Sequence, residues 1–174
     1  MKINQYLQLI KKLGACEEAV LDAHNYKTSQ ELWADCKRGD WMLWLMSQYA
    51  GESGCDKRKQ LVLTACKCAR LSLPYVEKGE LRPLRAIEAA EAWARDESIS
   101  LDNVRKAANV AACAANAAAF AAVCAAYTAY VTNAFYVANA AAYAANATRG
   151  DTLSQCADIV RADYPDIDLI MEEK

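Results

Sequence analysis

The most constraining feature of this sequence is a long stretch without charge. Ala107–Thr148 contains no Asp, Glu, Lys or Arg and consists mostly of alanine. Alanine combines the highest helix propensity with a small side chain, so this stretch favours helices that pack closely against their neighbours. A single helix over residues 101–148 would be roughly 70 Å long, which exceeds the width of a domain of this size. Three β-branched residues between positions 128 and 132 therefore predict a break near Tyr130–Asn133.

An uncharged run of this length raises the question of a membrane span. The run has no leucine or isoleucine, and no lysine or arginine cluster flanks it. Lipid cannot satisfy the side-chain amides of its five asparagines, which are Asn109, Asn116, Asn133, Asn139 and Asn146. Met1–Gln5 shows neither the apolar run nor the cleavage site of a secretory signal. We therefore expect a buried helical segment in a cytoplasmic protein that has no membrane partner.

Composition limits the fold class and the partners. The chain has 174 residues, of which 55 % are hydrophobic and 24 % charged, as expected for one compact domain spanning 1–174. Three prolines and six glycines are too few for the many turns of an all-β chain, so we predict an all-α fold. A net charge of −2 argues against a nucleic-acid partner, because such proteins neutralise many phosphates.

Capping and breaking residues divide the chain into about eight predicted helices, with long alanine-rich helices in the C-terminal part, 101–148. A capping box at Thr28–Glu31 opens a helix that we expect to end at Gly39. The next helix, with the run Trp41–Met46, is apolar on nearly all sides and should lie deep in the protein. The sequence also predicts that Gly14 ends the first helix and that Asp40, Asp56 and Ser100 are N-caps. Pro83 should lie in the first turn of a helix, and a last helix should start at Asp151 and stop before Pro165.

Eight cysteines and one histidine are the residues that could form a structural zinc site. Seven of the cysteines fall in helical patterns, so we interpret them as free thiols that pack like small apolar residues. Cys66 and Cys68 are two positions apart and point to different sides of a helix, which excludes the usual zinc spacing. His24 lies among acidic residues, where a solvated helix surface is a simpler interpretation than a general base. We expect neither a metal nor a cofactor.

Bulky side chains must complement the alanine surface, and two groups of them are candidate binding residues. Trp41 and Trp44 belong to the first group. The second is an aromatic and amide stripe with Tyr136, Asn139 and Tyr143 on one helix face. This stripe has two interpretations: a contact between helices, within the monomer or across a homodimer, or the wall of a ligand site, where tyrosines stack on a planar group.

A segment rich in arginine and glutamate provides the remaining candidates. Arg85 and Glu88 have the spacing of an intrahelical pair, whereas Arg82 precedes that pattern and is available for an acidic partner or a phosphate. In a weaker third hypothesis, Glu88 and Glu91 are the catalytic carboxylates of an enzyme. It is weaker because no nucleophile or metal motif accompanies them. We therefore expect no catalytic residue.

Several of these segments together resemble one protein family. The resemblance covers nearly the whole chain and rests on Gly14–Cys16, Gly39–Leu45, Arg82-Pro83 through Ala86–Ala90 to Trp93, the alanine run and Cys156–Arg161. These segments look like the immunity proteins, small all-helical cytoplasmic proteins of bacterial toxin–immunity systems that phages also carry. The resemblance implies that the protein neutralises a partner by binding it and does not act as an enzyme.

Two functional hypotheses follow. The leading one is a non-enzymatic immunity protein that sequesters or occludes a cognate protein toxin. The alternative is a phage anti-defence sponge, acting in the host cytoplasm, that sequesters a nucleotide-derived immune signal. The candidate binding residues for either are Trp41, Trp44, Arg82, Arg85, Glu88, Tyr136, Asn139 and Tyr143.

Overall fold

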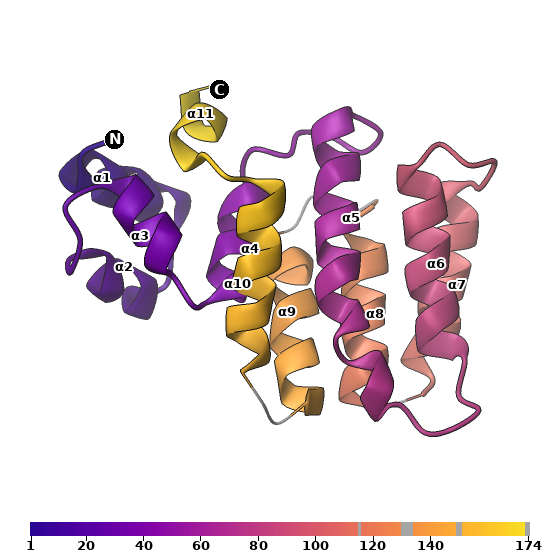
Figure 1. Cartoon of the computed structure of the whole chain (residues 1–174). Helices are drawn as coiled ribbons and strands as arrows, with labels where there is room; N and C mark the ends of the chain where they lie inside the picture. Colours follow the sequence, from indigo (N-terminus) through magenta and orange to yellow (C-terminus); the bar gives the residue numbers. More distant parts are fainter. Residues whose placement is uncertain (115, 130–133, 149–150, 173–174) are drawn as a thin grey trace.

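The computed structural model describes residues 1–114, 116–129, 134–148 and 151–172, and these residues form an all-α protein (Figure 1). The expected number of about eight helices is too low, because the described residues contain eleven α-helices and one short 3₁₀ helix, Leu73–Tyr75. The eleven are α1 (Ile3–Leu13), α2 (Glu17–Ala23), α3 (Ser29–Asp35), α4 (Gly39–Ser47), α5 (Asp56–Arg70), α6 (Arg82–Ala94), α7 (Leu101–Ala112), α8 (Ala117–Tyr127), α9 (Ala134–Thr148), α10 (Thr152–Asp163) and α11 (Ile167–Glu172).

Seven of the helices form two layers. In the view of Figure 1, α10, α5 and α6 lie in front, and α4, α9, α8 and α7 lie behind them. Each front helix contacts the helices of the rear layer that it covers: α10 packs on α4 and α9, α5 on α8 and α9, and α6 on α7 and α8. The other four helices, α1, α2, α3 and α11, gather at the α4–α10 end of the array (Figure 1).

Many helix boundaries follow the sequence prediction. Gly14 ends α1 in the left-handed conformation, with φ of 85°, and Pro83 lies in the first turn of α6. The Thr28 hydroxyl accepts a hydrogen bond from the amide of Glu31, whose carboxylate accepts one from the amide of Thr28 in return. Ser100 caps α7 by accepting from the amide of Asn103. These signals depend on residues within one helical turn, which is why sequence alone identifies them.

Three predicted boundaries are wrong. Asp40 and Asp56 are not N-caps, because they lie in the first turns of α4 and α5, where Arg38 and Cys55 occupy the cap positions. The helix that starts after Thr28 ends at Asp35 and not at Gly39. Tertiary contacts explain this early end, since Arg161 of α10 donates a 2.6 Å hydrogen bond to the carbonyl of Cys36, the C-cap residue.

The alanine-rich segment also differs from the prediction. An unpredicted break after Ala112 separates α7 from α8, so the segment contains three described helices. Asn116 explains the new start, because its side-chain oxygen accepts a 2.8 Å hydrogen bond from the amide of Ala119. The predicted break at Tyr130–Asn133 lies outside the described residues.

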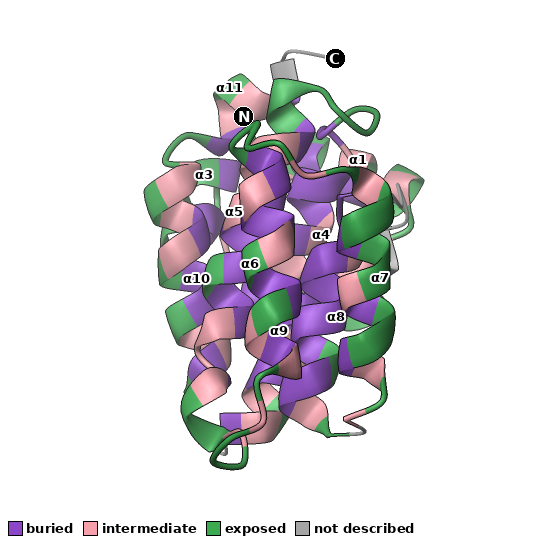
Figure 2. Ribbon diagram, turned by 90° about the vertical axis from the view of Figure 1, so that its right-hand side faces the viewer, coloured by how far each residue is buried: buried purple, intermediate pink, exposed green. Residues whose placement is uncertain are grey.

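The buried residues, which are purple in Figure 2, belong to two clusters of different character. One lies around α4 and contains large side chains, among them Trp33, Met42 and Leu43. The other lies between α5, α6, α7 and α8 and is mostly alanine, with Trp93 at its edge. Helices α5 and α9 contribute residues to both clusters, so they connect the two halves of the core.

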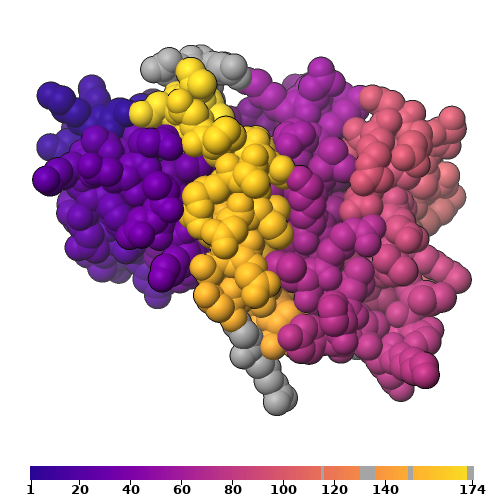
Figure 3. Space-filling view, in the orientation of Figure 1, coloured from indigo at the N-terminus to yellow at the C-terminus, as the bar shows by residue number. Residues whose placement is uncertain are grey.

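One hydrogen bond that attaches the N-terminal helices to the array comes from Trp33, and a close backbone contact joins α4 to α10 within the array. The indole Nε1 of Trp33 donates a 2.8 Å hydrogen bond to the carbonyl of Tyr164, just after α10. At the start of α4, Gly39 lies so close to α10 that an added Cβ would come within 2.4 Å of the Cys156 Cβ and 2.7 Å of the Ala157 nitrogen. Figure 3 shows α10 and α11 filling the space between the N-terminal helices and α5.

Candidate functional site

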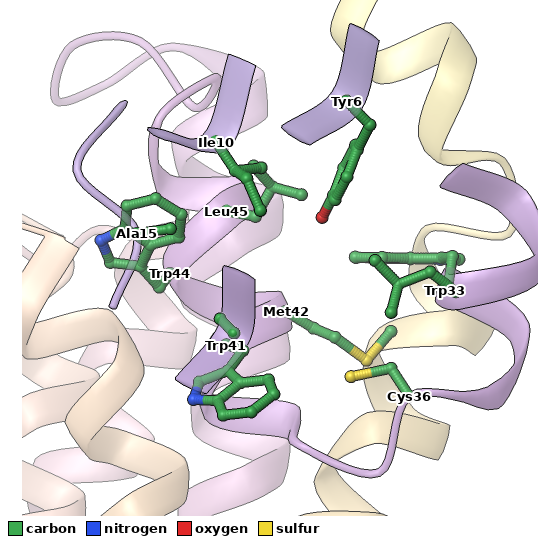
Figure 4. A pocket seen from close by; sticks show the side chains of 11 residues that line it. Tyr6, Ile10, Ala15, Trp33, Cys36, Trp41, Met42, Trp44 and Leu45 are labelled. Atoms are coloured by element: carbon green, nitrogen blue, oxygen red, sulfur yellow. The ribbon is translucent and has the colours of Figure 1, made fainter. Parts of the chain in front are cut away.

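Trp41 and Trp44, two of the predicted binding residues, lie side by side on α4 and border the same cavities. The first cavity is an apolar space of about 40 Å³ between α1, α3 and α4, where Tyr6, Ile10 and Trp33 also point inward (Figure 4). Ligand sites for small molecules are usually about 300 Å³ or larger. This space therefore suits one or two water-sized groups and not a nucleotide.

Two larger hollows flank the Trp41 indole. One, of about 210 Å³, lies between the α1–α2 connection and α4, and Trp44 and Ala138 of α9 complete it. The other, of about 250 Å³, lies between α2, the end of α3 and Arg38. Trp41 is the residue that the two linings share. We call the residues that line the two hollows the Trp41 site: Gly14, Ala15, Cys16, Ala19, Asp22, Tyr26, Asp35, Cys36, Lys37, Arg38, Asp40, Trp41, Trp44 and Ala138.

A short local network orients the Trp41 ring. The guanidinium of Arg38 lies over the indole, 4.1 Å from the ring centroid. Asp40 holds this guanidinium with two hydrogen bonds, of 2.9 Å from Nε and 2.8 Å from Nη2. Glu18 of α2 adds a longer ion pair of 3.6 Å. The hydrogen bonds to Asp40 raise the pKa of Arg38, so the cation over the ring keeps its charge at every physiological pH.

The charge around the Trp41 site is predominantly acidic. Helix α2 begins with Glu17 and Glu18 and contains no basic residue. The lining of the site has three carboxylates, Asp22, Asp35 and Asp40, and Glu18 adds a fourth through its ion pair with Arg38, against the two cations Lys37 and Arg38. A rim of this kind favours association with a positively charged surface.

Tyr26 adds a hydrogen-bond donor to the rim. Its hydroxyl donates a 3.0 Å hydrogen bond to Asp35. Partial burial and the Asp35 carboxylate raise the pKa of Tyr26 to about 12, so the phenol stays protonated at neutral pH. Sequence reasoning missed Tyr26, Arg38, Asp22 and Asp35. One local signal could have indicated the network: the sequence places Arg38 close to both Asp40 and Trp41 at the start of a predicted helix.

The predicted candidates on α6 lie elsewhere. Arg82 is held at the start of this helix by Glu80, which accepts a 2.9 Å hydrogen bond from the Arg82 Nε. The same interaction lowers the pKa of Glu80 to about 2. Arg85 and Glu88 are exposed, and their predicted mutual ion pair is not among those of the described residues. Figure 1 shows α6 on the opposite side of α5 from α4, so these residues do not join the Trp41 site.

Glu91, the second carboxylate of the weaker enzyme hypothesis, is buried in an ion pair. Its oxygens accept hydrogen bonds of 2.7 and 2.8 Å from Arg70 of α5, and Arg95 lies 3.6 Å away. The hydrogen bonds from Arg70 lower the pKa of Glu91. Glu91 thus connects α5 to α6, whereas Glu88 is exposed. His24 is exposed at the C-terminal end of α2.

The predicted stripe on α9 lies against α8. Tyr136 meets Tyr127 edge to face with ring centroids 5.0 Å apart, and Tyr143 lies 5.5 Å from Phe120. The side-chain nitrogen of Asn139 is buried without a hydrogen-bond partner. Both rings therefore contribute to the α8–α9 contact within the monomer. The predicted homodimer through the alanine-rich helices stays a prediction.

Within residues 1–114, 116–129, 134–148 and 151–172, no three His, Cys, Asp or Glu side chains come together to hold a metal ion. All eight cysteines are free thiols, five of them buried. No helix within these ranges has the length and apolar character needed to cross a membrane.

Comparisons with protein-family models, with curated proteins and with solved structures found no match to this chain. The candidate site therefore rests on its own geometry.

Proposed function

We propose that this protein is a non-enzymatic binding protein of the immunity type, which neutralises a protein toxin by covering part of its surface with the Trp41 site. The observation that carries the proposal is the position of Trp41 between two hollows under an acidic rim. Trp, Tyr and Arg dominate the energetics of protein interfaces, and the site presents Trp41, Tyr26 and Arg38 together. The resemblance of the sequence to immunity proteins points in the same direction.

The charge of the site indicates the kind of surface that the partner presents. Four carboxylates lie in or beside a site centred on Trp41, so the complementary surface carries lysine or arginine side chains around an apolar projection. Association should slow as salt is added, because rim charges accelerate encounter mainly through long-range attraction.

The test uses the toxin whose gene neighbours the gene for this chain. We expect the purified chain to bind that toxin and to protect cells that produce it. Trp41→Ala should weaken binding at least about 30-fold, the effect of losing about 2 kcal/mol at an interface centre. Arg85→Ala on the exposed surface of α6 is the control and should bind like the wild type. Equal binding by wild type and Trp41→Ala would contradict the assignment of the site, and no binding to any neighbouring toxin would contradict the function.

The alternative function, sequestration of a nucleotide-derived signal, makes a different prediction. It is predicted to combine Trp41 and Trp44 with Arg82 and Arg85 around one ligand, whereas these two tryptophans lie on α4 and the two arginines on α6, with α5 between the helices. Mass spectrometry of the small molecules that the protein releases on denaturation distinguishes toxin binding from sequestration of a nucleotide. A nucleotide released in stoichiometric amount would favour the sponge.

A further inference from the structure

Two buried cysteines from different helices meet where α5 packs on α10. Cys68 of α5 and Cys156 of α10 both have 0 % exposure and lie 88 positions apart in the sequence. The Cys68 sulfur lies 4.0 Å from the carbonyl oxygen of Cys156, and both residues belong to the cluster around α4. Helices α5 and α10 are neighbours in the front layer of Figure 1. The fold therefore brings together two thiols that the sequence does not connect.

The Cys68 thiol also interacts with the Cys156 thiol itself. A hydrogen bond between the two side chains, together with burial, raises the pKa of Cys68 well above its usual value. Cys68 therefore stays protonated at neutral pH, which leaves Cys156 as the partner that reacts first as a thiolate. Because a disulfide forms between side chains that face each other at short range, this contact is the arrangement from which a bond between α5 and α10 can form.

Helix α4 holds Cys156 in this position. A Cβ added at Gly39 would come within 2.4 Å of the Cys156 Cβ, so the first turn of α4 lies directly on this residue. Helix α10 packs on α4 and on α5 at once. Close packing of this kind keeps Cys156 beside Cys68 in the folded protein.

We propose that Cys68 and Cys156 form a reversible disulfide in the folded protein when a peroxide oxidises them. The Cys156 thiolate attacks one oxygen of hydrogen peroxide and breaks the O–O bond, which leaves a sulfenic acid and a hydroxide that takes up the thiol proton as water. The Cys68 sulfur then attacks the sulfenic sulfur, loses its proton and displaces a second water. Two thiols and one peroxide thus give one disulfide and two waters, and a dithiol reductant reverses the change.

The burial of the pair determines its rate of oxidation. Peroxide is small and uncharged, and it reaches the two sulfurs during local opening of the α5–α10 contact. We therefore expect slower oxidation than at the exposed cysteines, which are Cys16, Cys55 and Cys113. The inference is independent of the proposed function, because neither Cys68 nor Cys156 lines the Trp41 site.

Peptide mapping of the folded full chain tests the proposal. Trypsin places Cys66 in peptide 60–67, Cys68 in peptide 68–70 and Cys156 in peptide 150–161. Iodoacetamide first blocks the exposed thiols, hydrogen peroxide is then added, and N-ethylmaleimide in denaturant finally blocks every thiol that remains. We expect peptide 68–70 linked to peptide 150–161, with two hydrogens fewer than the separate peptides, and release of both by dithiothreitol. Peptide 60–67 should carry N-ethylmaleimide.

Two matched variants assign the bond. Cys66→Ala and Cys68→Ala each remove one buried thiol from α5, but Cys66 belongs to the alanine-rich cluster and its thiol faces the carbonyl of Ile87 in α6. Cys66→Ala should still give the linked peptide, whereas Cys68→Ala should not. If Cys68→Ala does not fold, the wild-type peptide map decides. The proposal is overturned if the folded wild type gives no linked peptide, if Cys66 is linked as fast as Cys68, or if linkage occurs only in urea.

Discussion

Four consecutive residues set the geometry around Trp41. Gly39 lets the first turn of α4 lie directly on α10, and this contact orients the helix. Arg38 and Asp40 then lock together through two hydrogen bonds and hold the guanidinium over the indole. The local sequence Arg38–Trp41 therefore determines how the ring is presented, but its position against α2 depends on the packing of α4 on α10.

Replacing Gly39 tests this close contact. Gly39→Ala would place a Cβ within 2.8 Å of three α10 atoms, including backbone atoms that cannot move aside easily. We expect a loss of about 2–3 kcal/mol in the free energy of unfolding, as for other overpacked core positions, measured by urea denaturation. Gly54→Ala is the comparison. A Cβ at Gly54 would have open space around it, so the only cost there is the positive φ of 92°, which alanine rarely adopts. A smaller loss for Gly39→Ala than for Gly54→Ala would contradict the steric argument.

The ion pair between Glu91 and Arg70 predicts a pH-dependent contribution to stability. The pKa of Glu91 is lowered in the folded state, so its contribution is fully present above the ordinary glutamate pKa of about 4.3 and is lost as pH falls through the lower folded value. We expect Glu91→Gln to lose about 1 kcal/mol at pH 7, a figure reduced because Arg70 is partly exposed to solvent.

Urea denaturation at pH 7 and at pH 3 measures this difference. The difference in the free energy of unfolding between the wild type and Glu91→Gln should be smaller at pH 3 than at pH 7. Glu88→Gln is the matched control, because Glu88 is exposed on the same helix and should change stability by less than about 0.5 kcal/mol. If this difference in unfolding free energy did not change with pH, the titration of Glu91 could not be its origin.

At the scale of the element, the break between α7 and α8 shows how one side chain divides an alanine run. Alanine favours helix on both sides of the break, so propensity alone does not place it. Asn116 has an extended backbone, and its side chain bonds to the amide of Ala119, which satisfies one free amide of α8. Asn109, three positions before the end of α7, instead accepts a hydrogen bond of 3.0 Å from the Tyr127 hydroxyl of α8. The same residue type thus plays different structural roles.

Removing this cap should weaken α8. Asn116→Ala is expected to cost about 1 kcal/mol of unfolding free energy, whereas Asn116→Asp should retain most of the stability because its carboxylate also accepts from the helix amides. Thermal and urea denaturation measure both. If Asn116→Asp lost as much as Asn116→Ala, the hydrogen bond to Ala119 would not be the stabilising interaction.

At the scale of the whole molecule, α5 and α9 lie where the two core clusters meet. Leu61 and Cys68 of α5 belong to the cluster around α4, whereas Val62 and Cys66 belong to the alanine-rich one. Helix α9 divides its residues in the same way, with Val137 on one side and Ala140 on the other. Opening either cluster therefore exposes a face of both helices.

Hydrogen exchange should reflect this arrangement. We expect the backbone amides of α5 and α9 to exchange most slowly, because their exposure requires the core to open, and those of α2 and α11 to exchange faster. Mass spectrometry of peptides after deuterium labelling measures the order. Slower exchange in α2 than in α5 would contradict the central position of α5.

Part of the candidate site was predictable. Trp41 and Trp44 are candidates in the sequence because large aromatic residues are needed beside an alanine-rich surface, and the structure places both on cavities. Asp22, Tyr26 and Asp35 could not be assigned to Trp41, because their proximity depends on how α2 and α3 fold back against α4. Arg58 is similar: its position in a charged first turn suggests an exposed residue, yet it is buried.

The sequence alone determined the helical class and the boundaries at Gly14, Thr28, Pro83 and Ser100, because helix propensity and capping act between residues less than two turns apart. Only the tertiary structure decided that Trp41 meets an acidic rim, that Glu91 meets Arg70, and that Arg58 is buried with one guanidinium nitrogen lacking an acceptor. Each of these depends on which helices become neighbours, and that choice results from the packing of side chains far apart in the chain.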